Sequence, residues 1–141
     1  LASLKEKYSR ENVNFLGGLP HADVMSYLRR SKLLVMPSVW FEGFPMILVE
    51  AFSLGIPALV SDIGSLPEIV VDGKLGRKFK SGDASSLRKA LRDLWHDKSA
   101  LLLYSQNAHI EYLSSYTSSK NYSQLMAIYT RLVNARTHDA K

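Results

Sequence analysis

The chain has 141 residues, of which 46% are apolar and 22% charged, a composition that is ordinary for one soluble globular domain. It contains no cysteine, so disulfides, thiolate metal sites and a cysteine nucleophile are excluded. No apolar run approaches the roughly 18 residues that a membrane-spanning helix needs.

The formal net charge of +5 is gathered in three basic clusters, Arg29-Arg30-Lys32, Arg77-Lys78-Lys80 and Arg88-Lys89-Arg92. Such clusters most often form solvated faces, and attraction to anionic lipid or to a phosphorylated acceptor is the next interpretation. Nucleic acid is disfavoured because aromatic residues are not interleaved with the basic ones. The charge therefore does not decide the function.

The first elements alternate between helix and strand. We expect a helix that ends at Tyr8, a strand over Val13–Leu16, a helix over His21–Arg30 and a strand over Leu33–Met36. The loop between the first strand and its helix leaves the carboxyl end of that strand, where open α/β sheets bind ligands. Gly18 and Leu19 of this loop are candidates to contact a nucleobase, but its glycines fit a plain turn equally well.

The next helix is predicted to begin at Pro45, because proline suits the first helical position. It should run through Leu54 and stop at Gly55, which is free to take the left-handed conformation, with Pro57 preventing continuation. A strand is expected over Ala58–Ser61.

The remaining elements continue the alternation. We expect a short helix that ends near Val71, a strand over Gly76–Phe79, a helix capped by Asp83, and two final helices over Ser99–Leu113 and Ser119–Val133. Strands that alternate with helices indicate a parallel, doubly wound, Rossmann-like α/β sheet with helices on both faces and the last helices appended.

The loop into the helix at Pro45 has the features of an anion site. The first turn of a helix offers free N–H groups and the positive end of the helix dipole. Here the donors are the amides of Gly43, Phe44, Met46 and Ile47, whereas Pro45 has none. We therefore expect a phosphate or diphosphate to bind at this point.

Two carboxylates lie on either side of these donors. Glu42 precedes them, and Glu50 follows Met46 by four positions, about 6 Å along a helix. Carboxylates accept hydrogen bonds from hydroxyls and repel phosphates, so the order fits a sugar, a diphosphate and a ribose. The alternatives are an ordinary exposed loop acid at Glu42 and a structural pair with Arg or Lys at Glu50. Because the helix is apolar nearly all round, we expect Glu50 to be buried, and a buried carboxylate needs a partner. This favours the ribose hydroxyls as the partner of Glu50.

Several other chemistries lack their motifs. No Gly-x-Gly-x-x-Gly follows a strand, so a nicotinamide or flavin cofactor is disfavoured, and no P-loop is present. No Asp-x-Asp pair occurs, and His21, His96, His109 and His138 show no metal-ligand spacing. We therefore expect no cofactor and no metal, with the nucleotide diphosphate sugar acting as the donor substrate.

The segments Pro37-Ser38, Glu42-Gly43-Phe44-Pro45, Glu50-Ala51 and Gly55-Ile56-Pro57 together resemble the carboxyl-terminal, donor-binding domain of the family 4 retaining glycosyltransferases of GT-B fold. The resemblance covers roughly residues 1 to 130. It implies that Glu42 contacts hydroxyls of the donor sugar, that the segment from Gly43 to Ile47 binds sugar and diphosphate, and that Glu50 binds the ribose diol. It also places Leu19 against the base. Many members have glycine at the position of Pro45, so one amide donor is absent here.

The resemblance implies transfer of a sugar, with retention of configuration, from a nucleotide diphosphate sugar to an acceptor. Glu42 is the catalytic candidate, as a residue that orients the sugar and not as a nucleophile. The alternatives are a subunit that binds a nucleotide sugar without catalysis and a sugar-nucleotide epimerase.

We expect three further properties of the molecule. The first is a cytoplasmic location, either free or peripheral at the inner face of a membrane that carries a lipid-linked acceptor. The second is an amino-terminal acceptor-binding domain as partner. The third is that the chain is part of a longer enzyme and inactive alone, because the resemblance implies two strands and a basic Arg/Lys pair before the first helix.

Overall fold

The structure is a computed structural model that describes residues 2–8 and 12–139. Its sheet has three strands, β1 (Leu34–Met36), β2 (Ala58–Ser61) and β3 (Gly76–Phe79). The helices are α1 (Ala2–Tyr8), α2 (His21–Arg29), α3 (Met46–Ser53), α4 (Leu66–Ile69), α5 (Ala84–His96), α6 (Lys98–Glu111), the π-helix η1 (Tyr112–Tyr116) and α7 (Ser118–Asp139).

The three strands are parallel and lie in the order β1-β2-β3. In the central strand Leu59 pairs with Val35 on one side and with Arg77 on the other, and all four residues of β2 are buried. Continuous burial of a short apolar strand is typical of a parallel sheet covered on both faces. The expected strand over Gly76–Phe79 is confirmed, and so is the strand over Ala58–Ser61.

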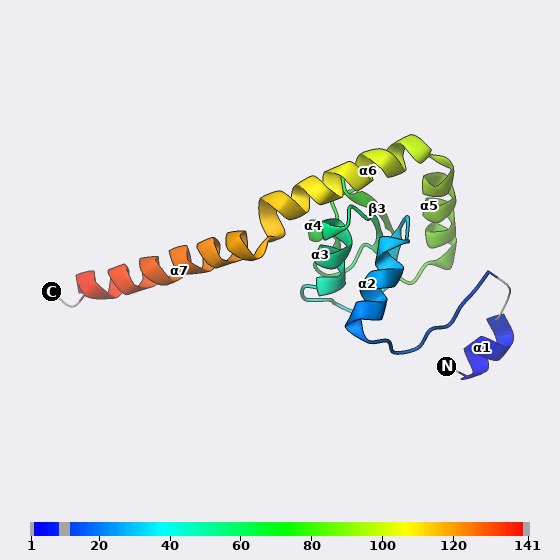
Figure 1. Cartoon of the computed structure of the whole chain (residues 1–141), viewed down its shortest axis with the longest axis horizontal. Helices are drawn as coiled ribbons and strands as arrows, with labels where there is room; N and C mark the ends of the chain where they lie inside the picture. Colours follow the sequence, from blue (N-terminus) through cyan, green and yellow to red (C-terminus); the bar gives the residue numbers. More distant parts are fainter. Residues whose placement is uncertain (1, 9–11, 140–141) are drawn as a thin grey trace.

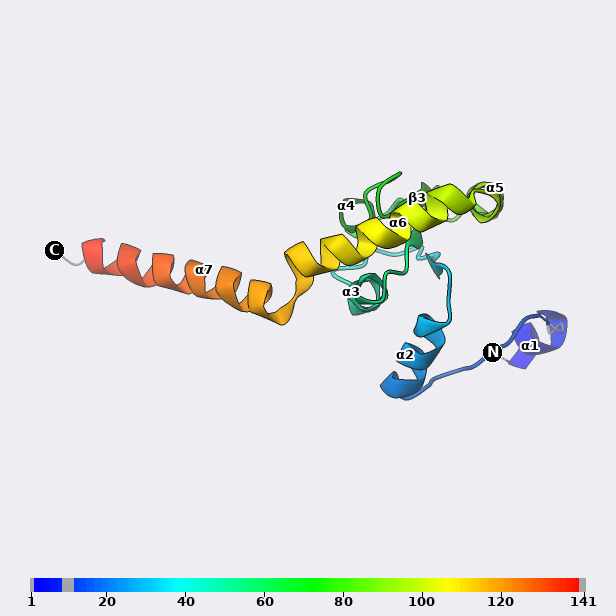
Figure 2. The same ribbon diagram turned by 45° about the horizontal axis from the view of Figure 1, so that its top comes forward.

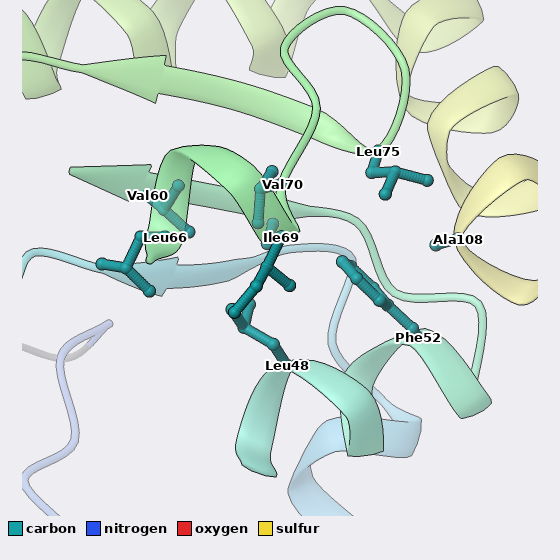
Figure 3. Packing of buried hydrophobic residues seen from close by; sticks show 9 residues of the cluster. Leu48, Phe52, Val60, Leu66, Ile69, Val70, Leu75 and Ala108 are labelled. Atoms are coloured by element: carbon teal, nitrogen blue, oxygen red, sulfur yellow. The ribbon is translucent and has the colours of Figure 1, made fainter. Parts of the chain in front are cut away.

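Helices cover both faces of the sheet (Figure 1). On one face α3, α4 and α6 enclose the main core, in which Phe52 and Leu48 of α3 lie beside Ile69 of α4 (Figure 3) and share one cluster with Val60 of β2. The opposite face is covered by α5, which packs against β2 and β3. The predicted Rossmann-like α/β arrangement with helices on both faces is thus confirmed.

A second, smaller cluster joins α2 to α3. Leu28 of α2 packs with Ala51 of α3 and with Ile56 in the connection that follows. This contact fixes the position of α2, and therefore of His21 at its amino end, relative to α3.

The expected strand over Val13–Leu16 is not formed. The structure assigns no strand over Asn14–Leu16, and Val13 and Leu16 are exposed. In Figures 1 and 2 this segment runs outside the body of the domain, between α1 and α2. The physical reason is that a strand needs a neighbour for its backbone groups, and among the described residues β1 pairs only with β2.

The start of α3 differs by one residue from the expectation. Pro45 has φ −74° and ψ 111°, so it is the N-cap residue, and the helix begins at Met46. Its carbonyl accepts a hydrogen bond from the amide of Leu48 at 3.0 Å. The helix ends at Ser53, one residue before the expected end at Leu54, and Gly55 takes the expected left-handed conformation with φ +68°.

Most other helix ends agree with the expectation within a few residues, but the last helix, expected over Ser119–Val133, continues as α7 to Asp139. Asp83 caps α5 as predicted, because its carboxylate accepts from the amides of Ser85 and Ser86. The helix expected over Ser99–Leu113 ends as α6 at Glu111 and continues as the π-helix η1.

The last helix, α7, extends away from the rest of the molecule (Figures 1 and 2). Its apolar side chains are exposed, namely those of Tyr122, Leu125, Met126, Ile128, Tyr129, Leu132 and Val133. No helix in the described ranges is both long and apolar enough to cross a membrane.

Candidate functional site

The predicted site residues Glu42 to Pro45 lie in the connection from β1 to α3, at the carboxyl end of the parallel sheet, and Met46 and Ile47 begin α3. The loops that follow β2 and β3 meet this connection at the same edge, through Ser65 and Ser81. Open α/β sheets bind ligands at this edge. The topology thus brings side chains from three separate loops together.

Glu42 is held by two side chains of its own loop. Its Oε1 atom accepts a hydrogen bond from Ser38 Oγ and another from Trp40 Nε1, each 2.9 Å long. Ser38 is almost fully buried, whereas Trp40 is 63% exposed. Glu42 is therefore an oriented carboxylate and not a mobile loop acid.

The backbone of Glu42 is fixed by the loop after β2. Ser65 donates to the Glu42 carbonyl from its hydroxyl, at 3.0 Å, and from its amide, at 3.4 Å. Gly64 has φ +61°, and a Cβ atom on it would lie 3.1 to 3.3 Å from backbone atoms of Glu42 and Phe41. Only glycine combines this conformation with this close approach.

The donors predicted at the start of α3 are free within the described part of the chain. The amides of Gly43, Phe44, Met46 and Ile47 donate to no backbone carbonyl there. Gly43 has open space around it, because a Cβ atom at this position would meet nothing within 4 Å. These groups can bind an anion where the dipole of α3 is positive.

Phe44 and Met46 are largely exposed, at 51% and 60%. The ring of Phe44 lies 5.9 Å from that of Tyr116 in η1, which in turn lies 6.4 Å from the buried Phe52. This row of rings connects the loop of the site to the hydrophobic core. Burial, and then the negative charge of Glu111, raises the pKa of the Tyr116 phenol.

Glu50 has a protein partner that the sequence did not indicate. Its Oε1 atom lies 2.9 Å from Nε2 of His21, the first residue of α2, and its side chain is 25% exposed. An ionised carboxylate can only accept, so the imidazole N–H donates. The expected alternative of an Arg or Lys partner is not found in the described ranges, and no sequence spacing could show a contact between residues 29 positions apart.

The two candidate base-contacting residues precede this pair. Gly18 is exposed with open space around it, and Leu19 is half-buried. The helix that follows them begins with His21, so the loop lies close in sequence to the partner of Glu50.

An open depression of about 820 Å³ is bordered by Phe44, Met46 and Glu50, together with residues of η1 and the start of α7. Its volume is in the range of small-molecule sites. Glu42 is not among its lining residues, so the structure does not bring the two predicted carboxylates into one cavity.

The side chains offer no preformed metal site in the described ranges, since no three His, Cys, Asp or Glu residues are grouped there.

Elsewhere on the molecule, a hydrogen bond from Lys74 holds the pKa of the Glu111 carboxyl below its usual value.

Comparison with known proteins identifies the family. The family model described as "Glycosyl transferases group 1" matches residues 2–111. Among curated relatives, an exopolysaccharide phosphotransferase of Streptomyces coelicolor is 32% identical over 127 residues, which are 89% of this chain and 13% of that protein. A phosphatidyl-myo-inositol mannosyltransferase of Mycobacterium leprae is 29% identical over 84% of this chain and 32% of its own length. The chain thus spans less than a third of the length of these two relatives.

Solved structures agree in fold. Sucrose-phosphate synthase from Thermosynechococcus elongatus superposes with a TM-score of 0.82 at 22% identity, over 95% of this chain and 33% of its own. HepE of Anabaena, solved in complex with UDP-glucose, superposes with a TM-score of 0.80 at 21% identity, over 92% of this chain and 35% of its own. The expected Rossmann-like half of a GT-B fold is confirmed by these likenesses. The chain therefore belongs to the glycosyl transferases group 1 family.

Proposed function

We propose that this chain is the donor-binding, carboxyl-terminal domain of a glycosyltransferase that moves a sugar from a nucleotide diphosphate sugar to an acceptor with retention of configuration. The observation that carries the proposal is the arrangement of Glu42 and the start of α3. An oriented carboxylate lies immediately before four backbone amides that donate to no carbonyl of the described chain, at the carboxyl edge of the sheet.

Each part of the donor has a matching group. The amides of Gly43, Phe44, Met46 and Ile47 donate to the diphosphate, and the dipole of α3 favours its charge. Glu42 orients the sugar through hydroxyls that donate to its carboxylate. Glu50 accepts from the ribose diol through Oε2, because His21 occupies Oε1. Gly18 and Leu19 lie against the base.

The contribution of this domain to catalysis is electrostatic. Negative charge develops on the departing diphosphate, and fixed amides and a helix dipole stabilise that charge without reorganising. Glu42 fixes the position of the anomeric carbon relative to these donors and does not attack it. No cofactor and no metal ion take part in this scheme.

The acceptor binds to a second domain, which covers the exposed apolar side of α7 and completes the enzyme. The named substrate of the mycobacterial relative is a lipid, so a lipid-linked acceptor at the cytoplasmic face of a membrane is one class that fits.

The test is a calorimetric titration of this chain with UDP-, GDP- and ADP-sugars and with the matching nucleoside diphosphates. We expect one sugar nucleotide to bind more tightly than its own diphosphate. If no member of the panel binds, or if the sugar adds nothing for any base, the proposed function is wrong.

A further inference from the structure

The two oxygens of the Glu42 carboxylate have different surroundings. Oε1 accepts hydrogen bonds from Ser38 Oγ and Trp40 Nε1, both at 2.9 Å, while Oε2 accepts none within the described part of the chain. Two donors on one oxygen fix the direction of the other oxygen. Glu42 therefore presents a single acceptor in a set orientation.

The first donor, Ser38, is itself anchored to the sheet. Its carbonyl accepts from Ser61 Oγ at 2.7 Å and from Ser81 Oγ at 3.1 Å. Ser61 is the last residue of β2 and is fully buried, and Ser81 follows β3. Serines from the ends of all three strands thus determine where the Glu42 carboxylate lies.

The second donor, Trp40, has no comparable structural reason for its position. Its side chain is 63% exposed, and it does not belong to either hydrophobic core cluster. Its indole N–H donates to Glu42. Trp40 is exposed, and its only polar group donates to Glu42. We therefore attribute the position of the Trp40 side chain to this hydrogen bond.

We propose that Ser38 and Trp40 are positioning residues that hold Oε1 of Glu42, so that only Oε2 is offered to a hydroxyl of the donor sugar. The proposal rests on the proposed function of Glu42 and adds the residues that set its orientation. A carboxylate released from them must be ordered again each time a sugar binds. The loss of one donor should weaken sugar binding about 3- to 10-fold, in line with the cost of ordering one side chain.

The binding experiment compares wild type with Trp40→Phe and Ser38→Ala. UDP-glucose is titrated beside UDP, and GDP-mannose beside GDP. Both variants should bind the sugar-bearing nucleotide about 3- to 10-fold more weakly and leave the affinity for the plain diphosphate unchanged. Trp95→Phe is the matched control, since Trp95 is also exposed, at 55%, and lies on α5 away from Glu42. It should change neither affinity.

A second measurement needs no ligand. The indole N–H signals of Trp40 and Trp95 are resolved by nuclear magnetic resonance and assigned with the two phenylalanine variants. The Trp40 signal should shift in Glu42→Ala, because its acceptor is lost, while the Trp95 signal stays in place.

The outcomes separate this inference from the proposed function. A wild-type chain that binds no sugar nucleotide of the UDP, GDP and ADP panel more tightly than its diphosphate would overturn the function proposed for Glu42. A wild-type preference that survives in Trp40→Phe and Ser38→Ala would overturn only the positioning role. An unmoved Trp40 signal in Glu42→Ala would overturn the contact itself.

Discussion

Replacement of Gly64 by alanine should destabilise the domain through its contact with the loop of Glu42. Gly64 has φ +61°, so alanine there takes a left-handed conformation that costs about 1–2 kcal/mol. The new Cβ would also lie 3.1 Å from the Glu42 nitrogen, 3.2 Å from its carbonyl oxygen and 3.3 Å from Phe41 Cα. All three are backbone atoms, so the loop must move, and such overpacking costs about 1–3 kcal/mol more.

Gly73 is the matched control for this substitution. It has φ +73°, but a Cβ atom added to it would meet nothing within 4 Å. Gly73→Ala therefore carries the conformational cost alone, about 1–2 kcal/mol. The difference between the two variants isolates the contact with the Glu42 backbone, and we expect it to be about 1–3 kcal/mol.

Urea unfolding followed by circular dichroism measures both free energies of unfolding. The same variants are then titrated with UDP-glucose and GDP-mannose. Gly64→Ala should also lower the affinity for a bound sugar nucleotide, because Glu42 is displaced, while Gly73→Ala should not. Equal losses of stability in the two variants would refute the reasoning that Gly64 is required by close approach to Glu42.

Three further predictions concern the core, pH and metal ions. Phe52 is fully buried, so Phe52→Ala should lose about 3–5 kcal/mol in urea unfolding, whereas Phe41→Ala, at an 82% exposed side chain, should stay within about 0.5 kcal/mol. The Lys74 hydrogen bond lowers the pKa of folded Glu111, so the pair stabilises the fold above the unfolded pKa and loses this effect as the pH falls through the folded value. Glu111→Gln should therefore lower the free energy of unfolding by about 0.5 kcal/mol at neutral pH, a value discounted for the exposure of the pair, and should not change it in acid. A difference in stability between the variant and wild type that persists in acid would contradict this. Sugar transfer by the complete enzyme should continue in the presence of EDTA, because the proposed scheme uses no metal ion. A saturable requirement for Mn²⁺ or Mg²⁺ in the chemical step would refute this prediction.

The sequence predicted those elements that depend on local patterns. Short apolar segments beside Pro37 and Pro57 indicated β1 and β2, whereas β3, with Arg77 and Lys78, was expected from the alternation of strands and helices. The caps at Gly55 and Asp83 follow from the residue types alone. The strand over Val13–Leu16 was predicted wrongly, because an apolar run does not reveal whether its backbone will find a partner. The shift at Pro45 has another origin, since the proline ring fixes φ but not ψ, and a ψ of 111° places Pro45 before the helix.

For the candidate site, the sequence shows the order of groups along the chain but not the contacts between distant segments. The order of Glu42, the free amides and Glu50 along the chain is local information. The contact between His21 and Glu50 depends on how α2 packs against α3. The orientation of Glu42 by Ser38 and Trp40 depends on a loop without a repeating pattern, so residue spacing could not indicate it.

The most direct test of the proposed function compares Glu42→Ala and Glu50→Ala by calorimetry with UDP, UDP-glucose, GDP and GDP-mannose. His21→Ala serves as the control that removes the partner of Glu50 but keeps the carboxylate. Glu50→Ala should weaken the plain diphosphate and the sugar nucleotide alike, by about 1.5–3 kcal/mol, the value of a lost charge-assisted hydrogen bond. Glu42→Ala should spare the plain diphosphate and weaken only the sugar-bearing form. Equal effects of the two substitutions on UDP or GDP alone would contradict the order of sugar, diphosphate and ribose along this helix.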